Sequence, residues 1–328
     1  MKRLILALLA LAAPFAAFLG VSEYRLTRVP ATQLAAKKVL LARQQAAVEV
    51  LVLGSSHAES GILPAELGAP AFNLAGPGQT LYYDRALLDK LQRRLPALKL
   101  VILPVSFFSL ESQLDEGPER WRGYYYQYEW GLPHRDWHLA WHVRNYSAYF
   151  CYGQEIGLRN ILRGRIRDAT ADFDAWGGWT NRPPPPGGFN ADGSPAELSA
   201  SARVALQRHH SRMKPEHIPR NTQLIEAMAR QLQRQGIRLV LVTLPVAQAY
   251  SDGMNAAAYQ RMQAALRQLA ARHGLTWLNY TGDRRFTDAD FWDADHLNLA
   301  GAQKFSRLLR AELAAGHARA TGEVSKER

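Results

Sequence analysis

Five short apolar runs, separated by amphipathic stretches, dominate the pattern of hydrophobic and polar positions along the chain. We predict that these runs form buried strands, at residues 48–53, 71–74, 98–105, 238–244 and 276–279. Continuous apolar runs of this length are typical of a parallel sheet that is covered on both faces. Apolar positions at helical spacing predict helices between and after the strands, at residues 82–95, 221–235, 256–273 and 299–313. This alternation predicts an α/β fold with a doubly wound, flavodoxin-like, mainly parallel five-stranded sheet, whose ligands bind at the carboxyl ends of the strands.

The first thirty residues have the pattern of a membrane segment. Lys2 and Arg3 precede an uncharged stretch, residues 4–21, which would form a helix of roughly 27 Å, close to the thickness of a bilayer core. The same pattern fits a cleaved signal peptide, and we favour an uncleaved signal anchor over residues 1–30. Basic residues before the segment predict a cytoplasmic N-terminus. The body of the protein would then face the periplasm or another extracytoplasmic space, either held at the inner membrane or secreted.

The middle of the chain interrupts the alternation of strands and helices. We interpret residues 31–328 as one α/β domain that carries an insertion at about 111–220. The insertion begins with twelve aromatic residues between Trp121 and Tyr152, and it continues into a Pro- and Gly-rich stretch, residues 177–195, which predicts an extended loop. The tail after residue 313 is polar and is expected to fray.

Composition narrows the classes of partner. The chain has 40 basic and 29 acidic residues, a net charge of +11, which favours a membrane surface, a glycan or a nucleic acid as partner. We expect no nucleic acid, because the basic residues are spread over amphipathic helices and the body is expected outside the cytoplasm. Cys151 is the single cysteine, so no intrachain disulfide can form. The chain has neither a phosphate-binding loop nor a dinucleotide fingerprint, and we expect no cofactor.

A serine, a histidine and an aspartate stand where nucleophilic catalysis would need them. The strand at 48–53 stops at Gly54-Ser55-Ser56, which would display Ser56 at the carboxyl end of the sheet. Near the other end of the chain, Asp293 and His296 are three residues apart, just before the helix that Asn298 would cap. At this spacing a carboxylate can reach the imidazole Nδ1, which leaves Nε2 free to accept the proton of a serine.

Two further strand ends offer groups that could stabilise an oxyanion. The second strand runs into Gly76-Pro77-Gly78, where bare backbone N–H groups would lie at the same sheet edge. The third strand ends at Ser106, whose hydroxyl would lie there too. We therefore take Gly78 and Ser106 as candidate oxyanion or substrate residues.

The order and placement of these blocks resemble the SGNH, or GDSL-like, hydrolase superfamily. In this resemblance "LGSSH" (residues 53–57) corresponds to the nucleophile block, "NLAGPGQT" (73–80) to the block with the oxyanion glycine, and "WDADH" (292–296) to the terminal Asp-x-x-His. It implies Ser56 as nucleophile, His296 as base, Asp293 as the residue that orients the base, and Gly78 as an oxyanion donor. The family's third block carries an asparagine where this chain has Ser106, so the family's asparagine donor is missing; the hydroxyl of Ser106 could replace it, although a hydroxyl reaches less far than an amide.

Gly-Ser-Ser in place of Gly-Asp-Ser, together with the N-terminal segment, resembles one branch of this superfamily. That branch includes DltD, the D-alanine transfer protein of teichoic acid synthesis, and more distantly the alginate acetylation proteins AlgJ and AlgX. The resemblance implies an extracytoplasmic acyl-transfer protein that works beside a membrane-bound O-acyltransferase on a cell-envelope polysaccharide or teichoic-type glycan.

Each candidate also has a plain structural interpretation. Ser56 could be an ordinary turn residue, Gly78 a turn glycine and His296 a packed histidine. Asp295 competes with Asp293 as the orienting carboxylate, although a side chain next to His296 would usually point elsewhere. His57 and Glu59 would line the pocket or cap the helix that follows.

The histidines of "HRDWHLAWH" (residues 134–142) form a separate pattern. His134, His138 and His142 are four apart, so a helix would bring them near one face, with Trp137 and Trp141 one residue over. A metal site, a membrane or partner contact, and plain packing all remain open for this segment. We expect no metal among the catalytic candidates.

Taken together, the sequence predicts a membrane-anchored serine acyltransferase or esterase that forms an acyl-Ser56 intermediate. The alternative is a non-catalytic glycan-binding or scaffolding subunit of a polysaccharide-modification complex, which the missing asparagine favours.

Overall fold

The computed structural model describes residues 1–182 and 198–315, and within the first helix the side chains of residues 4–9 and 11 are left out. The chain forms two compact units. The smaller unit comprises Met1–Val39 and Arg120–Ala171, and the larger unit comprises Leu40–Glu119 and Asp172–Arg328. Most of the predicted loop at 177–195 and nearly all of the tail after residue 313 lie outside the described residues.

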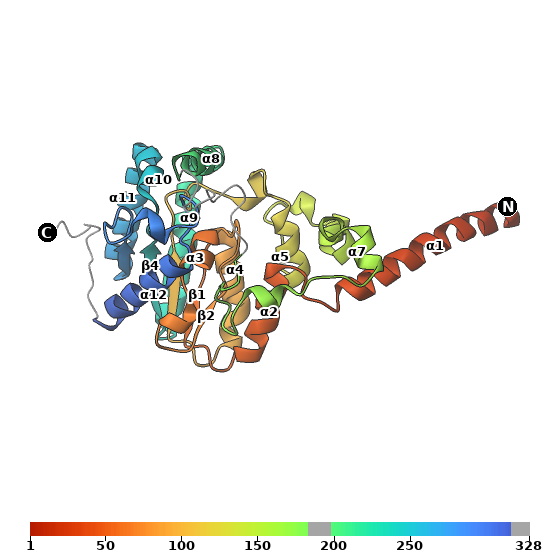
Figure 1. Ribbon diagram of the computed structural model, residues 1–328, viewed down its shortest axis with the longest axis horizontal. Helices are drawn as coiled ribbons and strands as arrows, with labels where there is room; N and C mark the ends of the chain where they lie inside the picture. Colours follow the sequence, from red (N-terminus) through yellow and green to blue (C-terminus); the bar gives the residue numbers. More distant parts are fainter. Residues whose placement is uncertain (183–197, 316–328) are drawn as a thin grey trace. The chain divides into compact units, whose positions relative to one another are not determined.

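A five-stranded sheet forms the centre of the larger unit (Figure 1). The strands are β1 Val50–Val52, β2 Ala71–Asn73, β3 Leu100–Pro104, β4 Arg238–Thr243 and β5 Thr276–Asn279. All neighbouring pairs are parallel and the spatial order is β2-β1-β3-β4-β5, which confirms the predicted α/β sheet and its five strands. Every residue of β1, β2 and β3 is buried, so both faces of these strands are covered.

Helices follow each strand of this sheet. They are α3 Ser56–Gly61, α4 Leu81–Leu91, α8 Leu198–His210, α9 Ile218–Arg234, α10 Gln248–Gly253, α11 Ala256–His273 and α12 Leu299–Ala314. Short 3₁₀ turns of this unit are η1 Pro64–Glu66, η2 Gln92–Arg94, η3 Leu114–Glu116, η8 Pro215–His217 and η9 Asp288–Asp290. α3 packs against α12, whereas α4 packs against α9 and α9 against α11. The four helices that the hydrophobic pattern predicts are therefore present as α4, α9, α11 and α12.

The order of the strands reverses direction between β1 and β3, because β1 connects outward to β2 while β3 leads toward β4 and β5. Ligand sites of open parallel sheets lie at this switch point, outside the carboxyl ends of the strands. Ser56 follows β1 and Ser106 follows β3, so both candidate serines lie at the switch point.

The smaller unit is built from two segments that lie far apart in the sequence. It contains α1 Lys2–Leu26, α5 Arg122–Trp130, α6 Gln154–Ile156 and α7 Leu158–Leu162, with the 3₁₀ turns η4 Trp137–Leu139 and η5 Val143–Asn145 and the π-helical turn η6 Tyr149–Gly153. α2 Gln33–Gln44 and η7 Ala169–Asp172 cross from one unit into the other along the chain. The end of α1 packs against η6 and α7.

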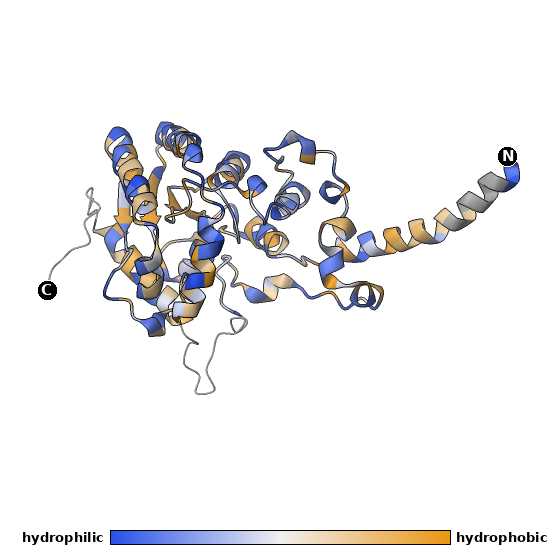
Figure 2. Ribbon diagram, turned by 90° about the horizontal axis from the view of Figure 1, so that it is seen from above, coloured by the Kyte–Doolittle hydropathy of each residue, from blue (hydrophilic) through white to orange (hydrophobic). Residues whose placement is uncertain are grey.

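The predicted membrane segment, residues 4–21, forms part of α1. Residues 12–21 of α1 are mainly hydrophobic, and the hydropathy colouring of the ribbon in Figure 2 is largely orange along the middle of this helix. Among the described residues, which leave out the side chains of 4–9 and 11, no helix is long and apolar enough to cross a membrane.

The three histidines of residues 134–142 do not share a helical face, although their spacing would allow it in a helix. His138 lies in η4 and His142 caps η5, so the segment is a series of tight turns. The buried His134 pairs through Nε2 with Oδ1 of Asn145, at 2.9 Å, whereas the ring of the exposed His138 stacks on Trp137. Side-chain caps explain the break, because Asp136 accepts a hydrogen bond from the backbone N–H of His138 and His142 accepts one from Arg144.

Candidate active site

The turn after β1 places Ser56 at the start of α3. Gly54 adopts φ +107°, a conformation that L residues with a side chain rarely take, and a Cβ at this position would lie 3.2 Å from Pro104 Cβ. Gly54 therefore lets the chain turn tightly against Pro104 at the end of β3. Ser55 follows as the N-cap residue, and Ser56 is the first residue of the helix and partly exposed.

Two buried polar residues hold this turn in place. The carboxylate of Asp84 accepts hydrogen bonds from the backbone N–H of Gly54, at 2.7 Å, and from Nε2 of Gln79, at 2.6 Å. Asn73, at the end of β2, donates to the carbonyl oxygens of Ala58 in α3 and of Ile62, the residue that follows α3. Burial raises the pKa of Asp84 to about 7, against the hydrogen bonds from Gln79 and Gly54, which lower it. The position and orientation of Ser56 thus depend on side chains of β2 and α4.

His296 lies between Ser56 and Asp293. Its Nε2 is 2.9 Å from Oγ of Ser56, and its Nδ1 is 2.8 Å and 3.0 Å from the two carboxylate oxygens of Asp293. Asp293 Oδ1 also accepts hydrogen bonds from the backbone N–H groups of Asp295 and His296, which orients the carboxylate. The structure therefore brings together Ser56, His296 and Asp293, in the arrangement in which Nδ1–H donates to the carboxylate and Nε2 accepts the serine proton.

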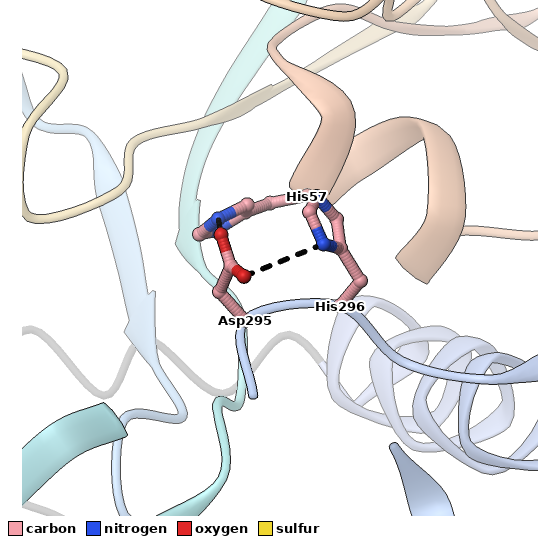
Figure 3. Close-up of side chains that lie close together, drawn as sticks. All are labelled: His57, Asp295 and His296. Atoms are coloured by element: carbon pink, nitrogen blue, oxygen red, sulfur yellow. Dashed lines mark hydrogen bonds and ion pairs between the residues drawn. The ribbon is translucent and has the colours of Figure 1, made fainter. Parts of the chain in front are cut away.

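A second serine, histidine and aspartate lie beside the first three. Nδ1 of His57 is 3.0 Å from Oγ of Ser106, and Nε2 of His57 is 3.2 Å from Oδ2 of Asp295. Figure 3 shows the carboxylate of Asp295 between the imidazoles of His57 and His296. Its Oδ1 accepts no hydrogen bond from the described residues and lies 3.5 Å from Nδ1 of His296. Asp295 therefore links the two sets.

The two sets differ in access and in the direction of the imidazole. Ser106, His57 and Asp295 are all buried, whereas Ser56 is partly exposed. The imidazole of His57 turns Nδ1 toward its serine and Nε2 toward its carboxylate, the reverse of His296. Burial lowers the pKa of His57, despite the opposing hydrogen bond and charge of Asp295, and so favours the neutral form of this imidazole. A neutral His57 that donates Nε2–H to Asp295 accepts the hydroxyl proton of Ser106 at Nδ1.

The charges around His296 favour its protonated form. Burial alone would lower the pKa of His296, but the carboxylates of Asp295 and Asp293 outweigh burial and raise the pKa to about 9. For Asp295 burial acts in the other direction and would raise the pKa. The positive charge of His296 and the hydrogen bond from His57 outweigh burial and hold the pKa of Asp295 well below its usual range. The base form of His296 in the free protein therefore increases as the pH rises toward 9.

Further groups surround Asp295. Nη2 of Arg208 is 3.5 Å and Nε2 of His209 is 3.7 Å from its Oδ2, and the hydroxyl of Tyr250 is hydrogen-bonded to Nδ1 of His209 at 2.6 Å. Burial lowers the pKa of His209 well below its usual range, so this imidazole is neutral. Ligand atoms of His57, Asp295 and His296 lie within 4.8 Å of one another, close enough to hold a metal ion. An ion bound at Nδ1 of His296 would compete with the hydrogen bond from that nitrogen to Asp293.

The candidate oxyanion groups lie at different places. Gly78 has φ +68° and lines a cavity of about 40 Å³ together with Gly54 and Ser55, beside the turn that carries Ser56. Both donors of Ser106 are engaged elsewhere, since its hydroxyl faces His57 and its backbone N–H donates to Oγ of Ser109 at 2.9 Å. The structure therefore places Gly78 next to the Ser56 turn and turns Ser106 away from an oxyanion role in this state.

The sequence predicted that Ser56, His296 and Asp293 lie together, but it did not predict the contacts of the neighbouring His57 and Asp295. His57 was expected to line the pocket and Asp295 to point away from His296, and neither was expected to pair with the other. Asp84, which holds Gly54, had no signal beyond its place in an amphipathic helix. His57 and Asp295 are 238 positions apart, and no pattern in a single sequence indicates that two residues so far apart form a pair.

Comparisons with known proteins reveal only distant structural similarity. No protein-family model and no curated protein matches the chain. Among solved structures, a proposed platelet activating factor from Streptococcus pneumonia is similar at 12% identity and a TM-score of 0.40, over 93% of this chain and 99% of that chain. A proposed acylhydrolase from Bacteroides fragilis is similar at 11% identity and a TM-score of 0.39, over 82% and 87% of the two chains. Likeness at this level carries no functional conclusion, and the chemistry is argued from the geometry above.

Proposed function

We propose that the protein is a serine hydrolase or acyltransferase that forms an acyl-enzyme on Ser56. The observation that carries the proposal is the position of His296, with Nε2 at 2.9 Å from Ser56 Oγ and Nδ1 at 2.8 Å from Asp293. A nucleophile, a base and a group that orients the base within hydrogen-bond distance are what nucleophilic catalysis by serine requires.

In the proposed reaction the base form of His296 takes the proton from Ser56 as Oγ attacks the carbonyl carbon of an acyl ester. The new C–O bond forms a tetrahedral oxyanion, which collapses when His296 returns the proton to the leaving alcohol. Asp293 keeps Nδ1–H of the imidazole directed toward the carboxylate, so that Nε2 faces Ser56. The backbone N–H groups of Ser56 and Gly78 are the candidate oxyanion donors, since the first residue of a helix has no intrahelical acceptor for its N–H. Water or a hydroxyl of an acceptor then releases the acyl group by the same steps in reverse.

We further propose that the acceptor is a cell-envelope polysaccharide or teichoic-type glycan and that the donor is supplied by a membrane-bound O-acyltransferase. The support is the resemblance of the Gly-Ser-Ser block to the extracytoplasmic acyl-transfer branch, together with the net charge of +11, which suits an anionic polymer or surface. The uncharged residues 4–21 of α1 would anchor the protein at the extracytoplasmic face of the inner membrane.

The test of the acyl-enzyme uses the full-length chain in detergent, treated with a fluorophosphonate and measured by intact mass. We expect one adduct, which is lost in Ser56→Ala. Ser55→Ala is the matched control, because Ser55 is the neighbouring hydroxyl and its side chain makes no cap hydrogen bond. An adduct that persists in Ser56→Ala, or no adduct in the native chain, would contradict the proposal.

The second candidate function is a non-catalytic glycan-binding or scaffolding subunit. The observation that favours it is Ser106, whose donors face His57 and Ser109 where the hydrolase family has an oxyanion asparagine. If Ser56→Ala left polymer acylation and complex assembly unchanged in cells, the scaffold would be the better description.

A further inference from the structure

The exposed apolar side chains of the protein are concentrated in the smaller unit. Among the described large hydrophobic residues that are exposed, Val204 and Leu299 belong to the larger unit and all the others to the smaller one. Those of the smaller unit are Met1, Phe15, Val21, Tyr24, Trp137, Trp141, Val143, Tyr146, Leu158 and Leu162. Five of them belong to α1 and α7, which pack on each other, and exposed apolar side chains that gather on one surface mark a site of contact with a membrane or another molecule.

Charge is concentrated in the same unit. Its two segments carry fourteen basic and five acidic residues, which accounts for nearly all of the net charge of +11. Exposed arginines flank the apolar residues of α7, at positions 159, 163 and 165. Basic and apolar side chains that alternate in this way are typical of segments that lie at an anionic lipid surface.

Three contacts fix η6 and α7 to the last third of α1. The ring of Phe18 packs edge to face on Tyr149, with centroids 5.1 Å apart. The carboxylate of Glu23 accepts hydrogen bonds from the backbone N–H groups of Ala148 and Tyr149, at 2.9 Å and 3.1 Å, and one from the hydroxyl of Ser147. Nη1 of Arg25 donates to the carbonyl oxygen of Ile161 at 2.8 Å. We call η6, α7 and the residues that join them, 149–162, the collar.

The length of α1 sets the level of the collar relative to a bilayer. Of the uncharged residues 4–21, only 4–17 precede the Phe18 contact, and they span roughly 21 Å at 1.5 Å per residue. A hydrocarbon core is about 30 Å thick, so a bilayer that α1 crosses has to extend to the level of residues 18–22. The collar packs on α1 at that level.

We propose that the collar lies in the headgroup layer of an anionic bilayer. The smaller unit then binds lipid directly, and α1 is not its sole contact with the membrane. Leu158 and Leu162, 49% and 48% exposed, would enter the boundary of the acyl chains, and the arginines at 159, 163 and 165 would pair with lipid phosphates. Tyr24, whose ring lies 4.6 Å from the guanidinium of Arg28, has the amphipathic form that residues at membrane interfaces share.

Lipid fits this surface better than a glycan. Sugar-binding surfaces stack pyranose rings on aromatic side chains, whereas exposed leucines between arginines offer a sugar no such stacking surface. The inference rests on the membrane anchoring included in the proposed function, and it is independent of the chemistry at Ser56.

The test places a fluorophore at the collar and at a distant control position in the full-length chain. Leu162→Cys and Val204→Cys, the latter 66% exposed in the larger unit, are each labelled with a nitrobenzoxadiazole thiol reagent. The native chain measures background labelling, because Cys151 is buried and its burial raises the pKa of the thiol. Both proteins are reconstituted into vesicles of phosphatidylcholine with about one-third phosphatidylglycerol, and vesicle association is measured by flotation.

We expect the label at position 162 to shift its emission to the blue and to be quenched by shallow doxyl lipids, and the label at position 204 to stay in water. A smaller shift in phosphatidylcholine vesicles would support the contribution of the arginines, and an equal shift in both would overturn it. If the chain floats with the vesicles and position 162 stays as aqueous as 204, the collar proposal is wrong while the anchor stands. If the chain does not float, anchor and collar both fail, and the adduct at Ser56 still decides the proposed chemistry.

Discussion

The two Ser–His–Asp sets use the same three residue types, and they differ in what surrounds them. Ser56, His296 and Asp293 lie at an accessible turn, with Nε2 of the imidazole toward the serine. Ser106, His57 and Asp295 are buried, with the imidazole reversed. The first set is accessible to a substrate, whereas in the second set burial favours the neutral imidazole and the serine hydroxyl faces that buried ring. The difference shows that residue types alone do not define a catalytic triad; access and the direction of the imidazole define it.

The largest expected difference between the two sets is in the histidines. His296→Gln should lower kcat by about 10⁴- to 10⁶-fold, because the base that activates Ser56 is lost. His57→Gln should lower it by less than about tenfold, since glutamine can still bridge Ser106 and Asp295. Steady-state hydrolysis of an activated short-chain ester measures both. Equal losses in the two variants would mean that the buried set takes part in the reaction.

The aspartates should differ next. Asp293→Asn removes the acceptor that directs Nδ1–H of His296, and we expect a loss in kcat of about 10⁴-fold, as for a triad whose histidine takes the wrong tautomer. Thermal unfolding of the variant provides the control, because Asp293 is partly exposed and its replacement by an isosteric amide should leave the melting temperature nearly unchanged. A loss of less than tenfold would move the orienting role to Asp295.

Asp295→Asn should change the pH dependence more than the maximal rate. The charge of Asp295 is the largest of the influences that raise the pKa of His296 to about 9, and the base form is required for attack. Activity of the native protein should therefore increase as the pH rises toward 9. In the variant the pKa of His296 falls, so the ratio of kcat/KM at pH 7 to that at pH 9 should increase.

Asp252→Asn, at an exposed aspartate, is the matched control for this profile and should reproduce the native ratio. An unchanged ratio in Asp295→Asn would show that Asp293 alone sets the pKa of His296.

The smallest effect is expected for Ser106→Ala. Because both donors of Ser106 are engaged by His57 and Ser109, its removal should change kcat by less than about fivefold. A loss of about 10²- to 10³-fold, the usual cost of an oxyanion donor, would instead show that its hydroxyl rotates toward the substrate during the reaction.

The fold was largely predictable because its signals are local. Each strand is a short apolar run, and the predicted helix at 256–273 coincides with α11 since apolar positions at helical spacing end at Gly274, whose φ of +61° stops the helix. The contact between Ser56 and His296 followed from chain order at the carboxyl edge of a parallel sheet. These features need no knowledge of distant partners.

What could not be predicted depends on partners far away in the sequence or on competition within a few residues. The pairing of His57 with Asp295 requires α3 and the loop before α12 to turn their buried sides together. Between His134 and His142 the helical spacing was misleading, because the side chains of Asp136 and His142 cap backbone N–H groups and divide the segment into 3₁₀ turns.

The division of the smaller unit into two segments has a consequence for biosynthesis. At a synthesis rate of about 5–20 residues per second, α1 is made roughly 7–29 seconds before residue 171, which completes the unit. Glu23 and Arg25 have none of their partners in this unit until residues 147–149 and 161 are made. The larger unit closes later still, since its sheet needs β5 and His296 arrives only near the end of translation. The smaller unit can therefore be complete before the loop that carries His296 is made and can reach Ser56.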